Sequence, residues 1–210
     1  MLTPLGKLGF DMGILERRIR QKENMRTNIL SVALQLVKDE GWQSLSIRKI
    51  ADAIEYSVPV IYDHFENKEA ILFELSLDGF RLLERTLEKN KKKYPDPAER
   101  LKAHAEAYWN FAFKNPEYYQ LMYGLGMPCS GAGKIKPEFN CFRDFIGEAI
   151  EGIVKNKKST DDETCFKIYA FWSVLHGLIS IVMMRCSDID DSTMNKKVMD
   201  DTVEAFIKNL

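Results

Sequence analysis

Apolar residues recur every three to four positions along almost the whole chain, and no stretch alternates apolar and polar residues as a β-strand would. This periodicity predicts an all-α protein with about nine helices. The helices are expected at about 24–40, 47–54, 58–65, 67–92, 97–115, 118–123, 138–156, 162–185 and from 194 onward.

Helix-end signals sharpen the first four of these segments. Ser46 and Ser57 precede the two short helices as N-caps, and Pro59 lies in a first turn, where its missing N–H costs little. Gly41 follows the first helix as a left-handed stop, and Asn67 caps the long helix. The first three helices are therefore expected to form one compact unit, from which the long helix leads onward.

The stretch from Ile50 to Lys68 carries two short helices joined by a tight turn, which is typical of a helix-turn-helix motif that binds DNA. An α-helix is about 10–12 Å across and fits the major groove, which is about 12 Å wide. Here the chain resembles the TetR family of transcriptional regulators. The resemblance covers residues 24–75 and rests on Ile50-Ala51, Ser57, Tyr62, His64-Phe65 and Lys68-Glu69, after the first-helix pattern that ends at Gly41.

The resemblance implies an N-terminal DNA-binding domain, a C-terminal helical domain for ligand binding and dimerisation, and neither a cofactor nor an enzymatic activity. The residues that it places at DNA are Ser46, Arg48, Ser57, Pro59, Val60, Tyr62, His64 and Lys68. The first two would approach backbone phosphates, and the proline and valine offer apolar contact to a thymine methyl. Two alternatives stay open: Tyr62 is a half-buried aromatic of the small core, and His64 is a solvated residue before the long helix.

One residue departs from the family pattern, because Glu55 stands where the family has glycine in the turn between the two short helices. A positive φ is uncommon for a residue other than glycine. Residues 17–68 hold nine basic and seven acidic side chains, a net charge of +2, so we expect modest non-specific DNA affinity and reliance on a dimer. The basic segment 17–22 either follows a minor groove or is a solvated leader.

The C-terminal half is rich in large rings with polar tips, which favours a cavity that orients a small guest over a plain aromatic core. The candidate lining residues are Trp109, Phe113, Tyr119, Tyr123, Phe142, Tyr169, Trp172, His176 and Met183. At 100° per residue, the last four of these fall on one face of segment 162–185. Alternatively, His176 is a core histidine satisfied by a neighbouring carbonyl or hydroxyl group.

A second face of segment 162–185 carries the small residues Ala170, Ser173 and Gly177, which let another helix come close. With the last helix, this face predicts a homodimer through a four-helix interface. The run 171–177 is also similar to the Trp-His-Gly element of one TetR subgroup. The uncharged stretch 168–184 is close to the length of a membrane span, but polar interruptions and the lack of a second span favour the buried centre of a bundle.

Composition sets further limits. The 210 residues are 45% hydrophobic and 29% charged with a formal net charge of -1, as in a globular protein without global attraction for nucleic acid or anionic membrane. The four cysteines have no paired spacing and the three histidines lie far apart. We therefore expect reduced thiols in the cytoplasm, and neither a metal site nor a catalytic site.

Together these features predict a flexible arm at 1–22, a DNA-binding domain at 23–68 and a ligand-binding and dimerisation domain at 69–210. The expected function is a repressor that binds a pseudo-palindromic double-stranded operator as a homodimer and is released by a small apolar or aromatic effector. Two alternatives remain. One is a dimeric ligand carrier whose DNA-binding motif has degenerated, and the other is a small helical enzyme with His176 as general base.

Overall fold

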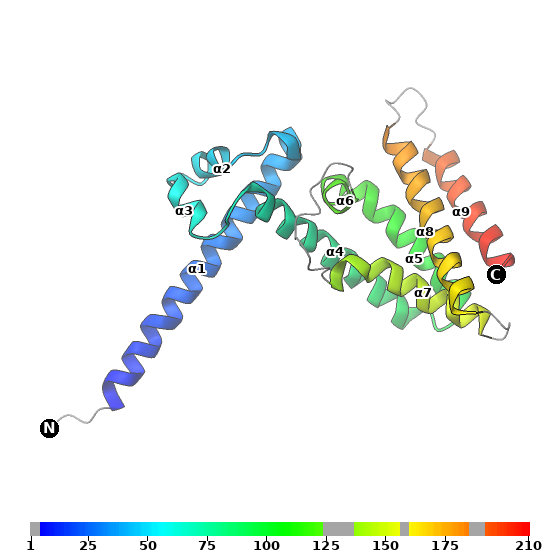
Figure 1. Ribbon diagram of the computed structural model, residues 1–210, viewed down its shortest axis with the longest axis horizontal. Coiled ribbons are helices and arrows are strands. Elements are labelled where there is room, and N and C mark those ends of the chain that lie inside the picture. The colour runs from blue at the N-terminus through cyan, green and yellow to red at the C-terminus, as the bar shows by residue number, and fades with distance from the viewer. Residues whose placement is uncertain (1–4, 124–136, 156–159, 185–191) are drawn as a thin grey trace. The chain divides into compact units, whose positions relative to one another are not determined.

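A computed structural model describes residues 5–123, 137–155, 160–184 and 192–210. Within these ranges the chain forms nine α-helices and two short 3-10 helices and no strand, so the all-α prediction is confirmed (Figure 1). The expected loop from Gly124 to Pro137 lies almost wholly outside the described residues. The chain folds into two compact units, which divide after Ser76 within α4 (Lys68–Lys93).

The N-terminal unit contains α1 (Leu5–Glu40), η1 (Trp42–Ser44), α2 (Ile47–Ala53), α3 (Val58–Tyr62) and the first part of α4. Helix α2 packs against both α1 and α3. The residues at the centre of this unit are apolar and come from every one of its α-helices; among them are Ile29, Ala33, Ile50, Ile61, Phe65 and Ile71. The inward packing predicted for Phe65 is confirmed.

Helix α1 is longer than predicted. We expected it to begin near Asn24, because apolar residues share one buried face only from there onward. The structure begins it at Leu5, so the segment expected to be an arm is helical from that residue. Leucine, glutamate, arginine and lysine, which are good helix formers, dominate residues 15–23, but Leu15 and Ile19 are exposed and no tertiary packing imposes a period on the sequence.

The predicted helix ends are largely confirmed. The Ser46 hydroxyl accepts a hydrogen bond of 3.2 Å from a backbone N–H of α2, and the Asn67 side chain accepts one of 2.8 Å from α4. Gly41 has a φ of 81° and stops α1 in the left-handed region, as expected. Helix α3 ends at Tyr62, three residues earlier than predicted, and the His64 N–H then bonds to the Ile61 carbonyl three residues back, as in a turn.

The C-terminal unit contains the rest of α4 with α5 (Pro97–Lys114), α6 (Pro116–Tyr123), η2 (Pro137–Asn140), α7 (Cys141–Val154), α8 (Asp161–Met184) and α9 (Ser192–Lys208). Helix α5 is its central element, since it packs against α6, α7, α8 and α9. Leu101, Ala105, Tyr108 and Ala112 of α5 are all fully buried and recur at helical spacing.

Helix α8 is only partly buried within the chain. Phe171, Leu175 and Ile179 are its buried residues, and Val174 and Ile181 on other sides of the helix are each 47% exposed. By length and composition α8 could cross a membrane, but just 17% of its apolar stretch is buried inside the chain. The expected buried centre of a bundle is therefore wrong for a single chain, because one side of this apolar helix lacks a covering neighbour among the described residues.

Candidate functional site

The turn between α2 and α3 has the backbone geometry that a helix-turn-helix requires. Glu55 adopts a φ of 59°, and the next N–H, that of Tyr56, bonds to the Ala51 carbonyl at 3.0 Å. The glutamate thus occupies the left-handed conformation that suits glycine, at a cost of about 1 kcal/mol. Glu55, which stands where the family has glycine, therefore leaves the turn intact but strains its backbone.

Helix α3 presents an exposed face with small and aromatic side chains. Ser57, Pro59 and Tyr62 are exposed, whereas Ile61 is fully buried and anchors the helix. Ser57 occupies the N-cap position, but its hydroxyl makes no capping hydrogen bond. Tyr62 is 54% exposed, so about half of it is covered, as the half-buried alternative expects, and the other half is open to solvent. The exposed face therefore keeps a serine hydroxyl and a tyrosine available for an external partner.

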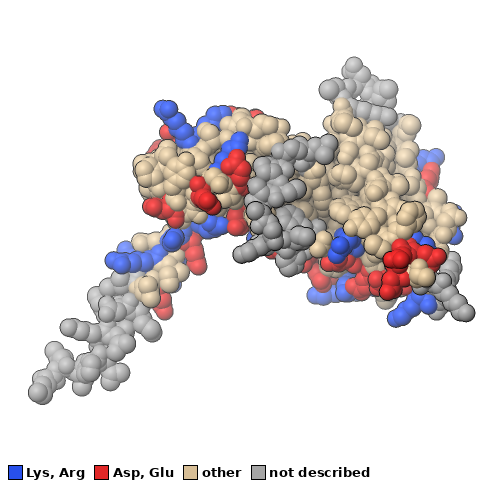
Figure 2. All heavy atoms as spheres, in the orientation of Figure 1, with Lys and Arg blue, Asp and Glu red and all other residues tan. Residues whose placement is uncertain are grey.

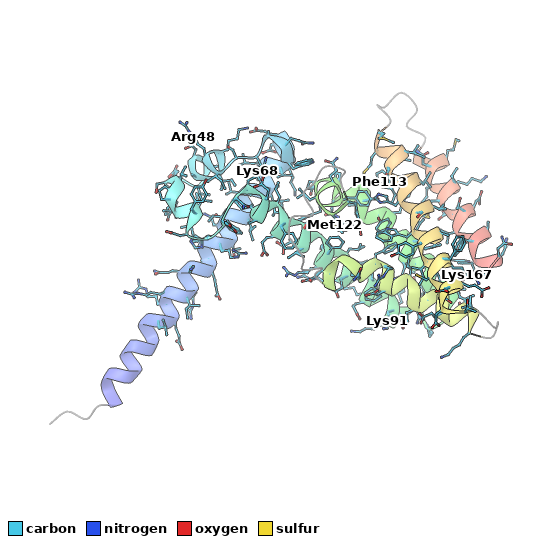
Figure 3. All side chains as sticks on the ribbon, viewed as in Figure 1. Arg48, Lys68, Lys91, Phe113, Met122 and Lys167 are labelled. Carbon is cyan, nitrogen blue, oxygen red and sulfur yellow. The ribbon has the colours of Figure 1, made fainter. Side chains whose placement is uncertain are left out.

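Cationic side chains lie on the elements next to α3 in the chain, Arg48 on α2 and Lys68 at the start of α4 (Figure 3). Arg48 on α2 is exposed and makes no ion pair with any described residue. Lys68, the first residue of α4, is half-buried and donates a hydrogen bond of 3.2 Å to the Gln43 carbonyl. The neighbouring Lys49 pairs with Glu40. Of these three cations, Arg48 is the one with no hydrogen bond or ion pair among the described residues to give up before it binds a phosphate.

His64 lies at the turn before α4, with its Nδ1 atom buried and without a hydrogen-bond partner in the described chain. Burial, assisted by the charges of Lys22 and Arg26, lowers the pKa of His64 below its usual 6.5, and Asp63 opposes this only in part. The imidazole is then neutral at pH 7. A phosphate contact by His64 would therefore be a neutral hydrogen bond rather than an ion pair.

Arg26 is a structural residue that sequence reasoning missed. Its guanidinium donates a hydrogen bond of 2.9 Å to the His64 carbonyl, lies 2.9 Å from the Glu74 carboxylate and sits 4.2 Å from the centroid of the Phe65 ring. It thereby joins α1 to the start of α4. A hollow of about 370 Å³ lies beside it, lined by these residues and the first turn of α4. A lone arginine on the apolar side of a helix was the available signal.

The basic segment 17–22 is helical, whereas a flexible arm was expected. As a helix it is about 10–12 Å across, whereas the minor groove is about 6 Å wide, so a minor-groove role does not suit the observed helical form. Figure 2 shows lysine and arginine beside aspartate and glutamate on the N-terminal unit, in keeping with its small net charge. Electrostatic attraction for DNA is accordingly local rather than spread over the unit.

A second candidate site is a cluster of rings in the C-terminal unit, to which α5, α6, α7 and α8 contribute. It unites five predicted residues, Tyr119, Tyr123, Phe142, Trp172 and His176, around Tyr108. The Tyr108 ring is fully buried and stacks on Phe142 with 4.1 Å between centroids. Tyr108 was absent from the predicted lining set, although an inward-facing tyrosine on α5 must find a partner for its hydroxyl group.

The polar atoms of the cluster form a hydrogen-bond network. Trp172 Nε1 donates to the Tyr108 hydroxyl at 3.2 Å, and that hydroxyl lies 3.3 Å from the hydroxyl of Tyr119. His176 Nδ1 lies 2.6 Å from the Tyr119 hydroxyl and 3.2 Å from that of Tyr108. The alternative of a core histidine satisfied by a neighbouring hydroxyl thus describes the Nδ1 side of His176.

The cluster is uncharged at neutral pH. Burial raises the pKa of the Tyr108, Tyr119 and Tyr123 hydroxyls and lowers that of His176. The Tyr123 hydroxyl is buried and has no hydrogen-bond partner of good geometry in the described chain. The site therefore combines an apolar body, a satisfied network and one buried polar atom that lacks a partner.

The remaining predicted lining residues lie elsewhere. Trp109 and Phe113 pair with each other at 4.7 Å between ring centroids, and neither makes a ring contact with the cluster among the described residues. Tyr169 is 49% exposed, and Met183 is a partly buried residue at the edge of the core. Across the described ranges, no group of three His, Cys, Asp or Glu side chains is placed to hold a metal ion.

Comparison with protein families places both units. The model described as bacterial regulatory proteins of the tetR family matches residues 29–75, and the model described as the tetracyclin repressor-like C-terminal domain matches residues 101–193. A curated relative, an uncharacterised HTH-type transcriptional regulator of Mycobacterium tuberculosis, is 24% identical over 171 residues, which are 80% of this chain and 74% of the relative.

Solved structures share the fold. The TetR family regulator PfmR from Thermus thermophilus aligns with a TM-score of 0.60 and 21% identity over 86% of this chain and 97% of its own. AibR, solved in complex with isovaleryl coenzyme A and operator DNA, aligns with a TM-score of 0.59 and 19% identity over 86% of this chain and 96% of its own. The arrangement of the nine described helices is therefore one that known regulators use.

Proposed function

The chain belongs to the TetR family of DNA-binding transcriptional regulators, and from this premise we propose that it is a cytoplasmic repressor which a small apolar or aromatic effector releases from its operator. The observation that carries the proposal is the exposed face of α3. That face begins at Ser57, whose hydroxyl makes no capping hydrogen bond, and the buried Ile61 anchors the helix. A short helix of this kind suits the major groove.

We assign two kinds of DNA contact to this surface. Ser57, Pro59 and Val60 lie at the start of α3 and would contact base edges, the last two by apolar contact with thymine. Arg48, Tyr62 and Lys68 border the face and would bind backbone phosphates, while Ser46 and His64 would offer neutral hydrogen bonds there. Few cations take part, so sequence-independent affinity is modest.

Operator binding of this kind needs two copies of the chain. The exposed apolar side of α8 supports a homodimer, because Phe166 and Met184 are each 74% exposed and Met194 and Val198 of α9 are exposed as well. Covering such a surface is strongly favourable in water. In the proposed dimer, α8 and α9 of both chains form a four-helix interface, and the two α3 helices lie about 34 Å apart along a pseudo-palindromic operator.

The effector is proposed to bind at the ring cluster of the C-terminal unit. Helix α4 belongs to both units, so a change in its tilt alters the separation of the two α3 helices in a dimer. A guest that favours a wider separation lowers DNA affinity, and by reciprocity DNA lowers affinity for the guest. The resulting response is release of the operator.

Fluorescence anisotropy with duplexes from the DNA upstream of the protein's own coding sequence tests the proposal. We expect specific binding that weakens steeply with salt, together with a dimeric mass by light scattering. An effector should bind the free protein more tightly than the operator complex. A salt-insensitive or absent interaction with every duplex would favour a ligand carrier, and equal effector affinity for free and DNA-bound protein would refute the release mechanism.

A further inference from the structure

The hydrogen-bond network of the ring cluster has a direction. Trp172 Nε1 can only donate, so the Tyr108 hydroxyl accepts from it and passes its own hydrogen to the Tyr119 hydroxyl. We assign the Tyr119 hydroxyl as donor to His176 Nδ1, 2.6 Å away, because it already accepts from Tyr108 and its own hydrogen has no other acceptor among the described residues. With Nδ1 accepting, the proton of the neutral imidazole sits on Nε2, and His176 Nε2 makes no hydrogen bond with the described residues.

A second unused donor lies beside this histidine. The Tyr123 ring centroid is 5.4 Å from that of His176 and 6.0 Å from that of Trp172. The Tyr123 hydroxyl is buried, and although the nearby Tyr108 hydroxyl influences its pKa, it makes no hydrogen bond of good geometry with the described residues. Buried polar groups are nearly always hydrogen-bonded. Two neighbouring side chains, one from α6 and one from α8, thus hold donors that no described residue satisfies.

No formal charge acts on this cluster from the described chain. Apart from burial, the influences on the three tyrosines come from one another, from Trp172 and from the Cys141 thiol, and burial alone acts on His176. A carboxylate placed here would be a buried charge without a counter-ion, which is strongly unfavourable. A carbonyl oxygen accepts two hydrogen bonds and needs no counter-ion.

We propose that the Tyr123 hydroxyl and the His176 Nε2–H select an uncharged effector that carries a carbonyl oxygen on an apolar body, in preference to a carboxylate. This inference rests on the proposed effector-binding role of the C-terminal unit. The network from Trp172 through Tyr119 positions His176 by fixing its tautomer. Tyr123 then supplies both specificity and a polar atom that is unpaired until the guest arrives.

Three probes of one shape test this choice on the purified full chain without DNA: acetophenone, benzoate and ethylbenzene. Ligand-observed NMR titration measures their affinities. Acetophenone should bind about ten-fold more tightly than ethylbenzene, because hydrogen bonds to its carbonyl contribute a net gain near 1.4 kcal/mol. It should also bind at least about ten-fold more tightly than benzoate. Benzoate binding as tightly as acetophenone, or no probe binding at millimolar concentration, would overturn the inference.

The variant Tyr123→Phe should remove about half of the free-energy preference for acetophenone over ethylbenzene, a loss of about three-fold in acetophenone affinity, because His176 still donates, and it should leave ethylbenzene unchanged. Tyr118→Phe, on the same helix but outside the network, is the matched control and should change neither. Without a probe, Tyr123→Phe should raise Tm by a few degrees, because an unpaired buried hydroxyl is removed. A lower Tm, or an unchanged ratio of acetophenone affinity to ethylbenzene affinity, would mean that the hydroxyl serves the fold and not a guest.

A second variant guards against a folding defect in the first. His176→Leu removes the other donor and should likewise reduce the preference for acetophenone, whereas retention of the full preference would contradict the assignment. Operator binding by the wild-type chain is measured alongside. If the protein binds its operator but none of the probes behaves as expected, only this inference is refuted. If the probes behave as expected but no operator binding is seen, only the DNA-binding part of the proposed function is refuted.

Discussion

The two units of this chain place their functional side chains in opposite ways. In the N-terminal unit the candidate DNA contacts are exposed and close in sequence, since Ser57 and Tyr62 flank a five-residue helix. In the C-terminal unit the candidate effector contacts are buried and distant in sequence, and Tyr108 meets His176 across 68 residues. The α3 face is open to a charged partner from solvent, whereas the ring cluster excludes water and charge.

Under the proposed function, this difference would let one chain bind two kinds of ligand. Caps, a turn and a single anchor at Ile61 suffice to present α3, because a groove supplies the rest of its surroundings. The ring cluster needs four helices to exclude water, and its polar atoms must be satisfied by each other or by a guest. Loss of packing should therefore harm the C-terminal site more than the N-terminal one.

The largest expected effect comes from the exposed side of α8. We expect Ile181→Glu to give a monomer, because a carboxylate in an apolar interface costs several kcal/mol, and operator affinity should fall about 100-fold. Sedimentation velocity and anisotropy measure the two effects. Leu82→Glu, at an exposed leucine of α4, is the control and should stay dimeric. A monomeric wild-type chain would contradict the proposed pairing of the C-terminal units.

The next largest effect comes from His104 in the C-terminal unit. His104 is fully buried, and both of its ring nitrogens lack partners among the described residues. Burial, with Arg100 nearby, lowers its pKa to about 4. The unfolded chain then binds the proton first, so stability should fall by about 2 kcal/mol between pH 7 and pH 5.

His104→Leu should remove most of this pH dependence and stabilise the protein at pH 7, since it deletes two unpaired polar atoms. Urea unfolding at both pH values measures the change. The smaller slopes from His64 and His176, whose pKa values are also lowered, should remain. An unchanged slope in the variant would show that His104 is not the group that resists protonation.

The smallest expected effect belongs to the N-terminal unit, at the strained turn. Glu55→Gly should stabilise the protein by about 0.5–1 kcal/mol, because relief of the positive φ exceeds the added entropy of the unfolded chain. Thermal unfolding should show a Tm higher by about 2 °C. Glu55→Gln removes the charge and keeps the strain, so equal stabilisation by the glutamine variant would assign the effect to charge instead.

Local signals made much of the fold predictable. Ser46, Asn67 and Gly41 mark helix ends by their own chemistry, and each does so in the structure. The N-terminal part of α1 escaped prediction because a helix without a buried face has no apolar period. Burial of α8 was overestimated, since periodicity does not tell a helix that is covered on all sides from one with an apolar side left exposed.

The two candidate sites also differ in how well they could be predicted from the sequence. The α3 surface could be predicted because its residues are neighbours in sequence. Membership of the ring cluster depends on long-range packing, so Tyr169 and Phe113 were included although both are substantially exposed, and Tyr108 was omitted although it is the centre of the network. Helical faces alone could not decide which rings would meet.

The central claim is that α3 lies in the major groove of an operator, presented twice. Dimethyl sulfate methylates guanine N7 in the major groove and adenine N3 in the minor groove, so protection from it on the bound duplex tests the claim directly. We predict protected guanine N7 atoms in two clusters about 34 Å apart, both lost in a Ser57→Ala, Tyr62→Ala variant. Protection confined to adenine N3, or guanine protection that survives in the variant, would contradict the account.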